Sequence, residues 1–164
     1  MKERTSCITI SYVAILALSI LCIILSIVIL YEKQGFETGN PNAVSNFCSA
    51  LAPRNQCQTV QTSQYSKTLG ISNPYYGMIG FGVLAILAVL LIIRENEYVK
   101  NVAIAGTMVA GIAALRFLYL QAFVLSAYCV FCMVVDIASL VLMGIGIQLI
   151  ARRGIFNKKS IKKH

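Results

Sequence analysis

Charged side chains are scarce in this sequence. Aspartate, glutamate, lysine and arginine together make up 12% of the 164 residues, whereas about 25% is usual for a soluble domain. Hydrophobic residues make up 58%, and the mean hydropathy is +0.77. This composition excludes an ordinary soluble domain and indicates a protein that is largely embedded in a membrane.

A segment long enough to form a soluble domain is also missing. Four apolar stretches, at about 8–31, 75–93, 102–125 and 127–150, match the roughly 20 residues that a transmembrane helix needs. The longest piece left over is a loop at 32–74, and a basic tail follows at 151–164. The sequence therefore predicts one all-α integral membrane domain spanning 1–164. It is a four-transmembrane-helix bundle with a structured outer loop between its first two helices.

The first apolar stretch lacks the features of a cleavable signal peptide. Lys2 and Arg4 precede it, but its apolar core is too long and it ends in YEK at 31–33 instead of small residues. We expect a retained helix. An internal repeat is lacking as well, and only one acidic residue falls inside a predicted span, which argues against a small transporter.

Positive charge is divided unevenly between the two sides of the predicted bundle. Four spans place both termini and the 94–100 turn on one side, and ten of the fourteen lysines and arginines fall there. The positive-inside rule then places both termini in the cytoplasm, where the basic tail meets anionic lipid. The net charge of +8 comes without an aromatic-lined soluble platform, so we expect no nucleic acid partner.

The six cysteines fall into two groups. Cys7 and Cys22 belong to the first helix, where free cysteine serves as a small hydrophobe. The other four are expected at the outer face, where disulfides persist. They are Cys48 and Cys57 in the loop, and Cys129 and Cys132 at the start of the fourth helix. Two static disulfides, a four-thiolate zinc site and a pair of redox-active disulfides are the open alternatives.

The CxxC spacing of Cys129 and Cys132 favours redox exchange over a static bond. A disulfide between them closes a very small ring, which restrains little of the unfolded chain. Ser126 is expected to cap the fourth helix, which places Cys129 in the first turn. There the helix dipole favours the thiolate and lowers the pKa of the thiol. The thiolate is the form that attacks disulfides.

The outer loop is too long for a passive connection, and its sequence predicts local structure. Thr62 or Ser63 can cap a helical turn that Gly70 ends. Asn73 is expected to cap the second membrane helix, with Pro74 at its first position. We therefore expect a folded lid that carries one cysteine pair over the mouth of the bundle.

The order of these elements resembles the vitamin K epoxide reductase family of disulfide-forming membrane enzymes. The resemblance covers roughly residues 48–150, and the first helix is compatible with it. The matching elements are Cys48 and Cys57, a serine six residues later (Ser63), Asn73 four residues before Gly77, and the CxxC motif that opens the last helix.

This resemblance implies a quinone-dependent thiol–disulfide oxidoreductase that supports disulfide bond formation. Cys129 and Cys132 match the active-site pair, with Cys132 facing a quinone of the menaquinone, ubiquinone or vitamin K type. Cys57 matches the residue that exchanges with Cys129, and Cys48 matches the thiol exposed to a partner. No fused thioredoxin-like domain is present in the sequence, so a separate thioredoxin-fold protein is the implied electron donor.

The same resemblance suggests which polar residues lie at the quinone. Asn73 matches a residue that hydrogen-bonds the quinone, and Ser63 matches a polar loop residue near it. Animal members carry a tyrosine where this sequence has Asp136. Quinone reduction in a prokaryotic cell membrane is therefore expected, with vitamin K epoxide reduction in the endoplasmic reticulum as the alternative. No metal is expected. The non-enzyme alternative is a structural four-helix protein stapled by disulfides.

Asp136 itself interrupts the fourth apolar stretch, one helical turn after Cys132. Arg116 is the one arginine inside a predicted span. At about 1.5 Å per residue, both lie roughly 13 Å below the outer boundary. Because lone charges are costly in a membrane, we expect an Arg116–Asp136 ion pair. The second hypothesis is that Asp136 delivers protons to the reduced quinone.

Overall fold

The computed structural model describes the backbone of residues 2–38, 48 and 56–161, and the side chains of residues 8–38, 48 and 56–152. Four long helices dominate it: α1 (Lys2–Thr38), α4 (Asn73–Ile93), α5 (Glu97–Tyr119) and α6 (Val130–Ile161). By length and composition, four segments can cross a membrane: Ile8–Thr38, Asn73–Ile93, Glu97–Leu125 and Val130–Arg152. The predicted all-α membrane bundle is confirmed.

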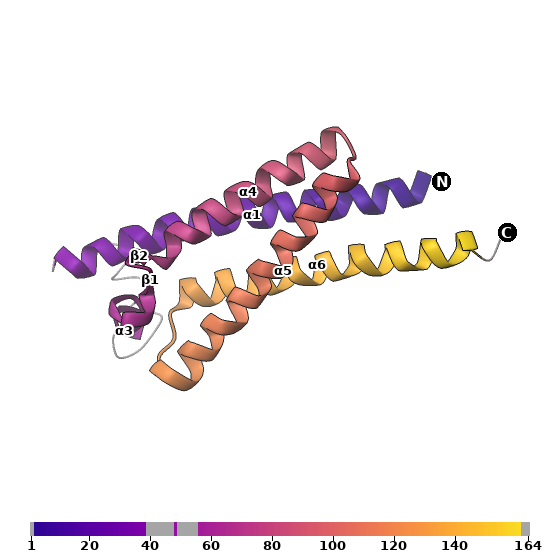
Figure 1. Cartoon of the computed structure of the whole chain (residues 1–164). Helices are drawn as coiled ribbons and strands as arrows, with labels where there is room; N and C mark the ends of the chain where they lie inside the picture. Colours follow the sequence, from indigo (N-terminus) through magenta and orange to yellow (C-terminus); the bar gives the residue numbers. More distant parts are fainter. Residues whose placement is uncertain (1, 39–47, 49–55, 162–164) are drawn as a thin grey trace.

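The four helices alternate in direction along the bundle (Figure 1). α1 packs mainly on α4 and α5 packs mainly on α6, and contacts between these two pairs are fewer. The start of α1, the turn between α4 and α5, and the far end of α6 lie together at one end. The short elements that follow α1 lie at the other end, beside the start of α6 (Figure 1).

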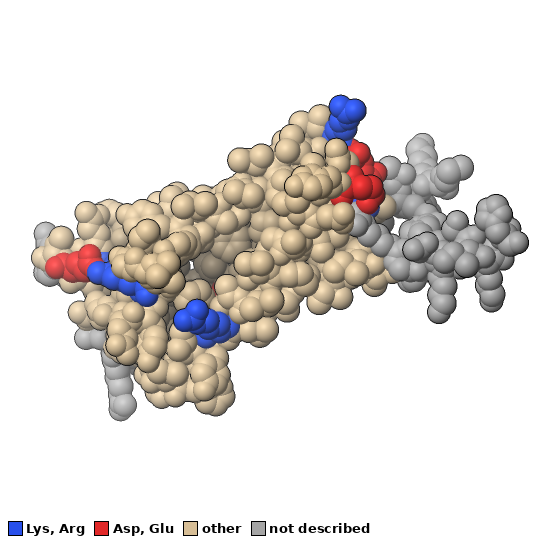
Figure 2. Space-filling model, viewed as in Figure 1, with Lys and Arg blue, Asp and Glu red and all other residues tan. Residues whose placement is uncertain are grey.

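Small residues allow α5 and α6 to approach closely. A methyl group added at Gly146 would lie 2.3 Å from Oγ1 of Thr107, and one added at Gly111 would lie 2.5 Å from Met143. The outer surface carries many exposed Ile, Val and Leu side chains. Figure 2 shows mostly uncharged side chains between the two charged ends of the molecule, as contact with lipid requires.

The outer loop contains a short helix and a hairpin. α3 (Gln56–Thr62) is followed by a 3-10 turn, η1 (Gln64–Ser66), and by strands β1 (Lys67–Thr68) and β2 (Ile71–Ser72). The strands are antiparallel, with Lys67 opposite Ser72. Leu69 (φ 53°) and Gly70 (φ 80°) form the turn, a pair of positive φ values that suits a two-residue hairpin. The helical turn expected from Ser63 to Gly70 is thus present only as far as Ser66, and a hairpin occupies the rest.

α1 is longer than expected. It continues through Thr38, whereas the sequence predicted a loop from residue 32. Glu32 and Lys33 are helical and buried because the loop supplies their partners. Gln61 donates a hydrogen bond to Glu32, and Lys33 donates to Ser72 at 2.9 Å. Charged residues therefore did not mark the end of the helix.

The boundaries of α5 and α6 also differ from the prediction. α5 begins at Glu97, not 102, because the side chain of Asn96 caps it by accepting from the N–H of Tyr98 at 2.8 Å. The chain then passes through a π-helical turn, η2 (Leu120–Leu125). α6 begins at Val130 and continues to Ile161, beyond the expected end at 150.

The expectation that Ser126 caps α6 is wrong. Ser126 adopts a left-handed conformation (φ 48°) and ends η2 instead. Four residues then separate η2 from α6, so the helix starts after Cys129 and not before it.

Candidate functional site

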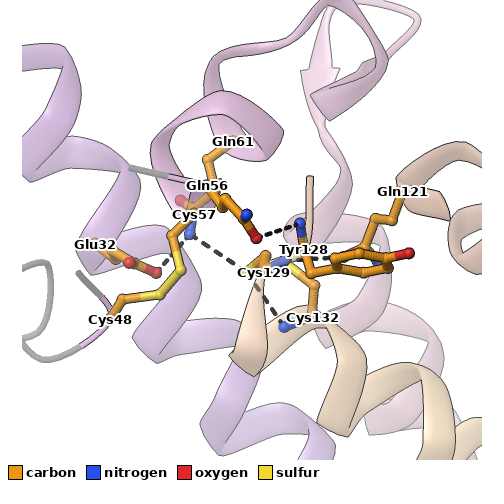
Figure 3. Close-up of a disulfide and its surroundings, with 9 residues drawn as sticks. All are labelled: Glu32, Cys48, Gln56, Cys57, Gln61, Gln121, Tyr128, Cys129 and Cys132. Atoms are coloured by element: carbon orange, nitrogen blue, oxygen red, sulfur yellow. Dashed lines mark hydrogen bonds between the residues drawn. A yellow bond between two sulfur atoms is a disulfide. The ribbon is translucent and has the colours of Figure 1, made fainter. Parts of the chain in front are cut away.

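Both predicted cysteine pairs meet at one end of the bundle. Cys48 and Cys57 are joined by a disulfide, and together with Cys129 they form a buried cluster against which Cys132 packs. Figure 3 shows the disulfide, which joins Cys57 of α3 to Cys48, beside Cys129 at the start of α6. The expectation that Cys48 is exposed is wrong for this state. Its side chain is 0% exposed, because it packs among the other sulfurs.

Cys129 occupies the cap position of α6. Its carbonyl accepts from the N–H of Met133 at 2.9 Å, and its Sγ accepts from the N–H of Cys132 at 3.4 Å. The sulfur therefore does what a capping oxygen usually does for a free N–H group. Cys129 thus lies one position before the helix, and not in its first turn as expected.

The two sulfurs of the CxxC motif are in direct contact. The thiol of Cys132 donates to Sγ of Cys129, with the two sulfurs 2.6 Å apart. This hydrogen bond is the main cause that lowers the pKa of Cys129, and the N–H of Cys132 lowers it further. Burial and the charge of Glu32 act in the opposite direction. Cys129 is therefore the residue of the pair that favours the thiolate.

Two glutamines of α3 connect it to the start of α6. The side-chain oxygen of Gln56 accepts from the N–H of Tyr128 at 3.3 Å. Nε2 of Gln61 donates to Glu32 and also lies 4.0 Å from Sγ of Cys129 (Figure 3). Gln61 thus contacts Glu32, which lies beside the loop disulfide, and also Cys129 of the CxxC motif.

A third glutamine, Gln121 of η2, supports the site from the other side. Its oxygen accepts from the N–H of Cys129 at 3.1 Å, and its Nε2 donates to Oδ2 of Asp136 at 3.1 Å. None of these three glutamines was predicted from the sequence as part of the site. For Gln121 a signal was available, since it is a lone amide in the apolar run LYLQAFVL (118–125).

The expected ion pair between Arg116 and Asp136 is not formed. Asp136 is 5% exposed and its hydrogen-bond partner is Gln121. Arg116 is exposed on α5, and the ion pairs among the described residues involve other groups. The neutral amide of Gln121, which follows Arg116 in the chain, hydrogen-bonds the carboxylate instead.

A cavity of about 730 Å³ opens beside the cysteines. Its walls come largely from apolar residues of α4 and α5. Cys132, Ser63, Asn73 and Asp136 all border it, whereas Cys129 does not. Figure 2 shows a hollow in the surface of the bundle. The two thiols of the CxxC motif therefore face different surroundings: one lies in the buried sulfur cluster and the other borders the cavity.

Asn73 has a different local role from the one expected. It is the first residue of α4, and Ser72 stands at the cap position without a side-chain cap bond. The Asn73 amide instead donates to the carbonyl of Tyr65 at 2.7 Å and accepts from the hydroxyl of Thr68 at 2.7 Å. It thus fastens the hairpin to α4 at the edge of the cavity.

The remaining cysteines lie apart from this site. Cys22 is buried in the bundle core, in line with its expected role as a small hydrophobe. The side chain of Cys7 lies outside the described part of the structure. Among the described side chains, the group with metal-ligand spacing is Glu32, Cys48 and Cys57, and here its two sulfurs are bonded to each other.

The fold and the site define a multi-pass membrane protein with two cysteine pairs in contact, one of them in the CxxC form of thiol–disulfide proteins. The chain belongs to the Vitamin K epoxide reductase family, whose model matches residues 13–147. The match begins in α1, so it includes the first helix. A search of curated proteins finds no match. Members of the family are oxidoreductases, which makes this chain a membrane oxidoreductase of the thiol–disulfide type.

Proposed function

We propose that the chain is a quinone-dependent thiol–disulfide oxidoreductase that supports disulfide bond formation. Electrons pass from a thioredoxin-fold partner to Cys48 and Cys57, then to Cys129 and Cys132, and finally to a membrane quinone. The observation that carries this proposal is the position of Cys132. It contacts Cys129 on one side and borders the cavity on the other.

The cavity suits a quinone in size and chemistry. Its volume of about 730 Å³ lies within the roughly 300–1,000 Å³ range of small-molecule sites. The lining is predominantly apolar, with polar groups from Ser63, Asn73 and Asp136 at its border. Asn73 uses one of its two amide hydrogens on Tyr65, so the second is available to a carbonyl oxygen.

When bound, the quinone supplies the chemistry of accepting two electrons and two protons. The protein holds the thiols in sequence. Cys57 lies in the same buried cluster as Cys129, which allows exchange between loop and helix. The lowered pKa of Cys129 favours the thiolate that such exchange needs. Asp136, which borders the cavity next to Cys132, is the residue we assign to hold a proton there.

We place the protein in a cell membrane, with the cysteine end at the outer face. The uneven distribution of lysine and arginine supports this orientation, because it favours cytoplasmic termini. A thioredoxin-fold protein in trans would then approach the Cys48–Cys57 pair from the aqueous side, and exchange requires a state in which these buried sulfurs are accessible. The presence of Asp136 in place of the tyrosine of animal members favours a quinone over an epoxide as the acceptor.

The test is quinone reduction by purified protein in detergent, with dithiothreitol as the reductant. Absorbance of a soluble benzoquinone or naphthoquinone is followed for the parent, Cys129→Ala, Cys132→Ala and, as a matched control, Cys22→Ala. We expect turnover by the parent and the control, and loss of turnover in the two CxxC variants.

A parent protein that reduces neither quinone would contradict the proposal, as would turnover that survives both CxxC substitutions. The non-enzyme alternative predicts a different result, since a structural staple keeps its disulfides intact in mild reductant. Mass spectrometry of maleimide-labelled thiols before and after dithiothreitol distinguishes the two.

A further inference from the structure

Glu32 is a buried carboxylate that the exchange sequence above does not use. It lies on α1, is 0% exposed, and accepts from Gln61 through Oε2. Its other oxygen, Oε1, has no hydrogen-bond partner among the described residues. A buried acceptor without a donor is unfavourable, which points to a partner for Oε1 in another state of the protein.

The groups nearest to this carboxylate are the sulfurs of the loop pair. A carboxylate oxygen of Glu32 and Sγ of both Cys48 and Cys57 all lie within 4.8 Å of one another. In the disulfide state these sulfurs carry no hydrogen. After reduction, each carries an S–H that can donate to the carboxylate. The unpaired acceptor of the oxidised state is therefore matched by new donors in the reduced state.

Among the described residues, the other titratable groups near Glu32 give no hydrogen bond to its Oε1. Lys33 is its neighbour on α1, but Nζ of Lys33 is bonded to Ser66 at 3.2 Å and to Ser72 at 2.9 Å. Just before α6, Cys129 lies close enough for the charge of Glu32 to raise the pKa of its thiol. Among the described side chains, no cation pairs with Glu32.

We propose that Glu32 is the general base that activates the reduced loop pair for exchange with the CxxC disulfide, a role that rests on the exchange step of the proposed function. The carboxylate takes the proton from the Cys57 thiol as its sulfur attacks Sγ of Cys129. The Cys57–Cys129 bond forms and the Cys129–Cys132 bond breaks. The electron pair of the broken bond stays on Cys132 as a thiolate, and the proton stays on Glu32.

Gln61 is the positioning residue for this step. Its Nε2 donates to Oε2 of Glu32 and to Sγ of Cys129, so it holds the base against α3 and faces the sulfur under attack. Cys57 lies on the same short helix, one turn before Gln61. One helical turn therefore carries both the attacking thiol and the side chain that orients its base.

The test isolates the loop pair and needs no quinone. Cys7, Cys22, Cys129 and Cys132 are replaced by alanine, and the reduced protein reacts with 4,4′-dithiodipyridine across pH 6 to 10. Glu32→Gln is compared with this background. The matched control is Glu37→Gln, which removes a carboxylate from the same helix where it is exposed and paired with Lys67.

We expect Glu32→Gln to slow the reaction at pH 7 by about tenfold or more. An ordinary thiol with a pKa near 8.5 is only about 3% thiolate at pH 7, so without a base the rate follows thiol ionisation and rises about tenfold per pH unit. The parent rate rises less steeply, and the two converge above about pH 9. Glu37→Gln behaves like the parent.

Two results overturn the proposal: equal rates for Glu32→Gln and the parent, or a difference that stays constant with pH. The second would mean that Glu32 only supports the local structure, because a misplaced thiol reacts slowly at every pH. If the native chain fails to reduce quinones while this pH-dependent difference is present, the proposed function is wrong and the role of Glu32 stands.

Discussion

The side chain of Gln121 donates a 3.1 Å hydrogen bond to Asp136 and joins the turn after α5 to the buried face of α6. The same amide accepts from the backbone N–H of Cys129. One side chain therefore fixes both the cap of α6 and the carboxylate one turn below Cys132. Neither contact involves a formal ion pair.

Replacing Gln121 by leucine should destabilise the protein by about 1–3 kcal/mol, because it leaves the buried carboxylate and the Cys129 N–H without partners. The midpoint of thermal unfolding in detergent checks this. Gln148→Leu is the matched control, since Gln148 is an exposed amide on α6 and its loss should change the midpoint little. Equal midpoints for the two variants would contradict the bridging role of Gln121.

Arg116→Gln and Asp136→Leu should act independently. Arg116 is exposed, and its loss should change the free energy of unfolding by less than about 0.5 kcal/mol. Asp136→Leu leaves the buried amide of Gln121 without its acceptor and should lower the free energy of unfolding by about 1–3 kcal/mol. A double-mutant cycle by denaturant unfolding should give a coupling energy below about 0.5 kcal/mol. A larger favourable coupling would restore the ion pair that the sequence suggested.

The thiolate of Cys129 should persist to lower pH than an ordinary thiolate. Its pKa is lowered chiefly by the Cys132 thiol. The absorbance at 240 nm of the parent minus that of Cys129→Ala reports the Cys129 thiolate, and it should rise at a pH below the value of about 8.5 that is usual for a thiol. In Cys132→Ala the same titration should move to higher pH, because the donor is gone. A midpoint that does not move would show that Cys132 has no part in stabilising the thiolate.

Gly146→Ala should destabilise the pairing of α5 with α6 by about 1–3 kcal/mol, the usual cost of overpacking. The added methyl would meet Oγ1 of Thr107 at 2.3 Å and Cε of Met108 at 2.7 Å. Gly144→Ala on the same helix meets nothing within 4 Å and is the matched control. The unfolding midpoints of the two variants should differ clearly. Similar values would mean that α5 and α6 accommodate the added methyl group without loss of stability.

Asn73→Ala should raise the KM for a soluble quinone, because it removes the amide at the cavity and frees the hairpin from α4. Thr68→Val separates these effects, since it removes only the hydroxyl that donates to Asn73. If Asn73 contacts the quinone, Asn73→Ala should raise KM several-fold more than Thr68→Val. The same small rise in both would assign Asn73 to the hairpin alone.

The sequence predicted the helices well because hydrophobic length is a strong signal in a membrane protein. It predicted the ends of the helices less well. Glu32 and Lys33 looked like the start of a loop, yet Gln61 and Ser72 supply their partners from more than twenty residues away. Such contacts form only in the folded chain, and no local pattern at 31–33 indicates them.

The cysteine pairs could be grouped from topology, but their supporting residues could not be found that way. Ser126 and Asn73 were assigned as caps from residue type alone, and the structure uses both elsewhere because tertiary contacts decide backbone conformation. The ion pair of Arg116 and Asp136 was argued from equal depth in the membrane. Equal depth does not fix which way a side chain points around a helix, and Arg116 points outward.

The three-residue offset between Cys129 and Cys132 divides the molecule into two surfaces that can change separately. Cys48 and residues of α3 pack around the first thiol, and residues of α4 and α5 form most of the wall beside the second. Substitutions around Cys48 and Cys57 would therefore alter which soluble protein is recognised, and those in α4 and α5 would alter which lipid-soluble molecule is accepted. Val60 and Gln61 of α3 border both regions. The single helical turn between the two thiols thus lets most of each specificity evolve apart from the other.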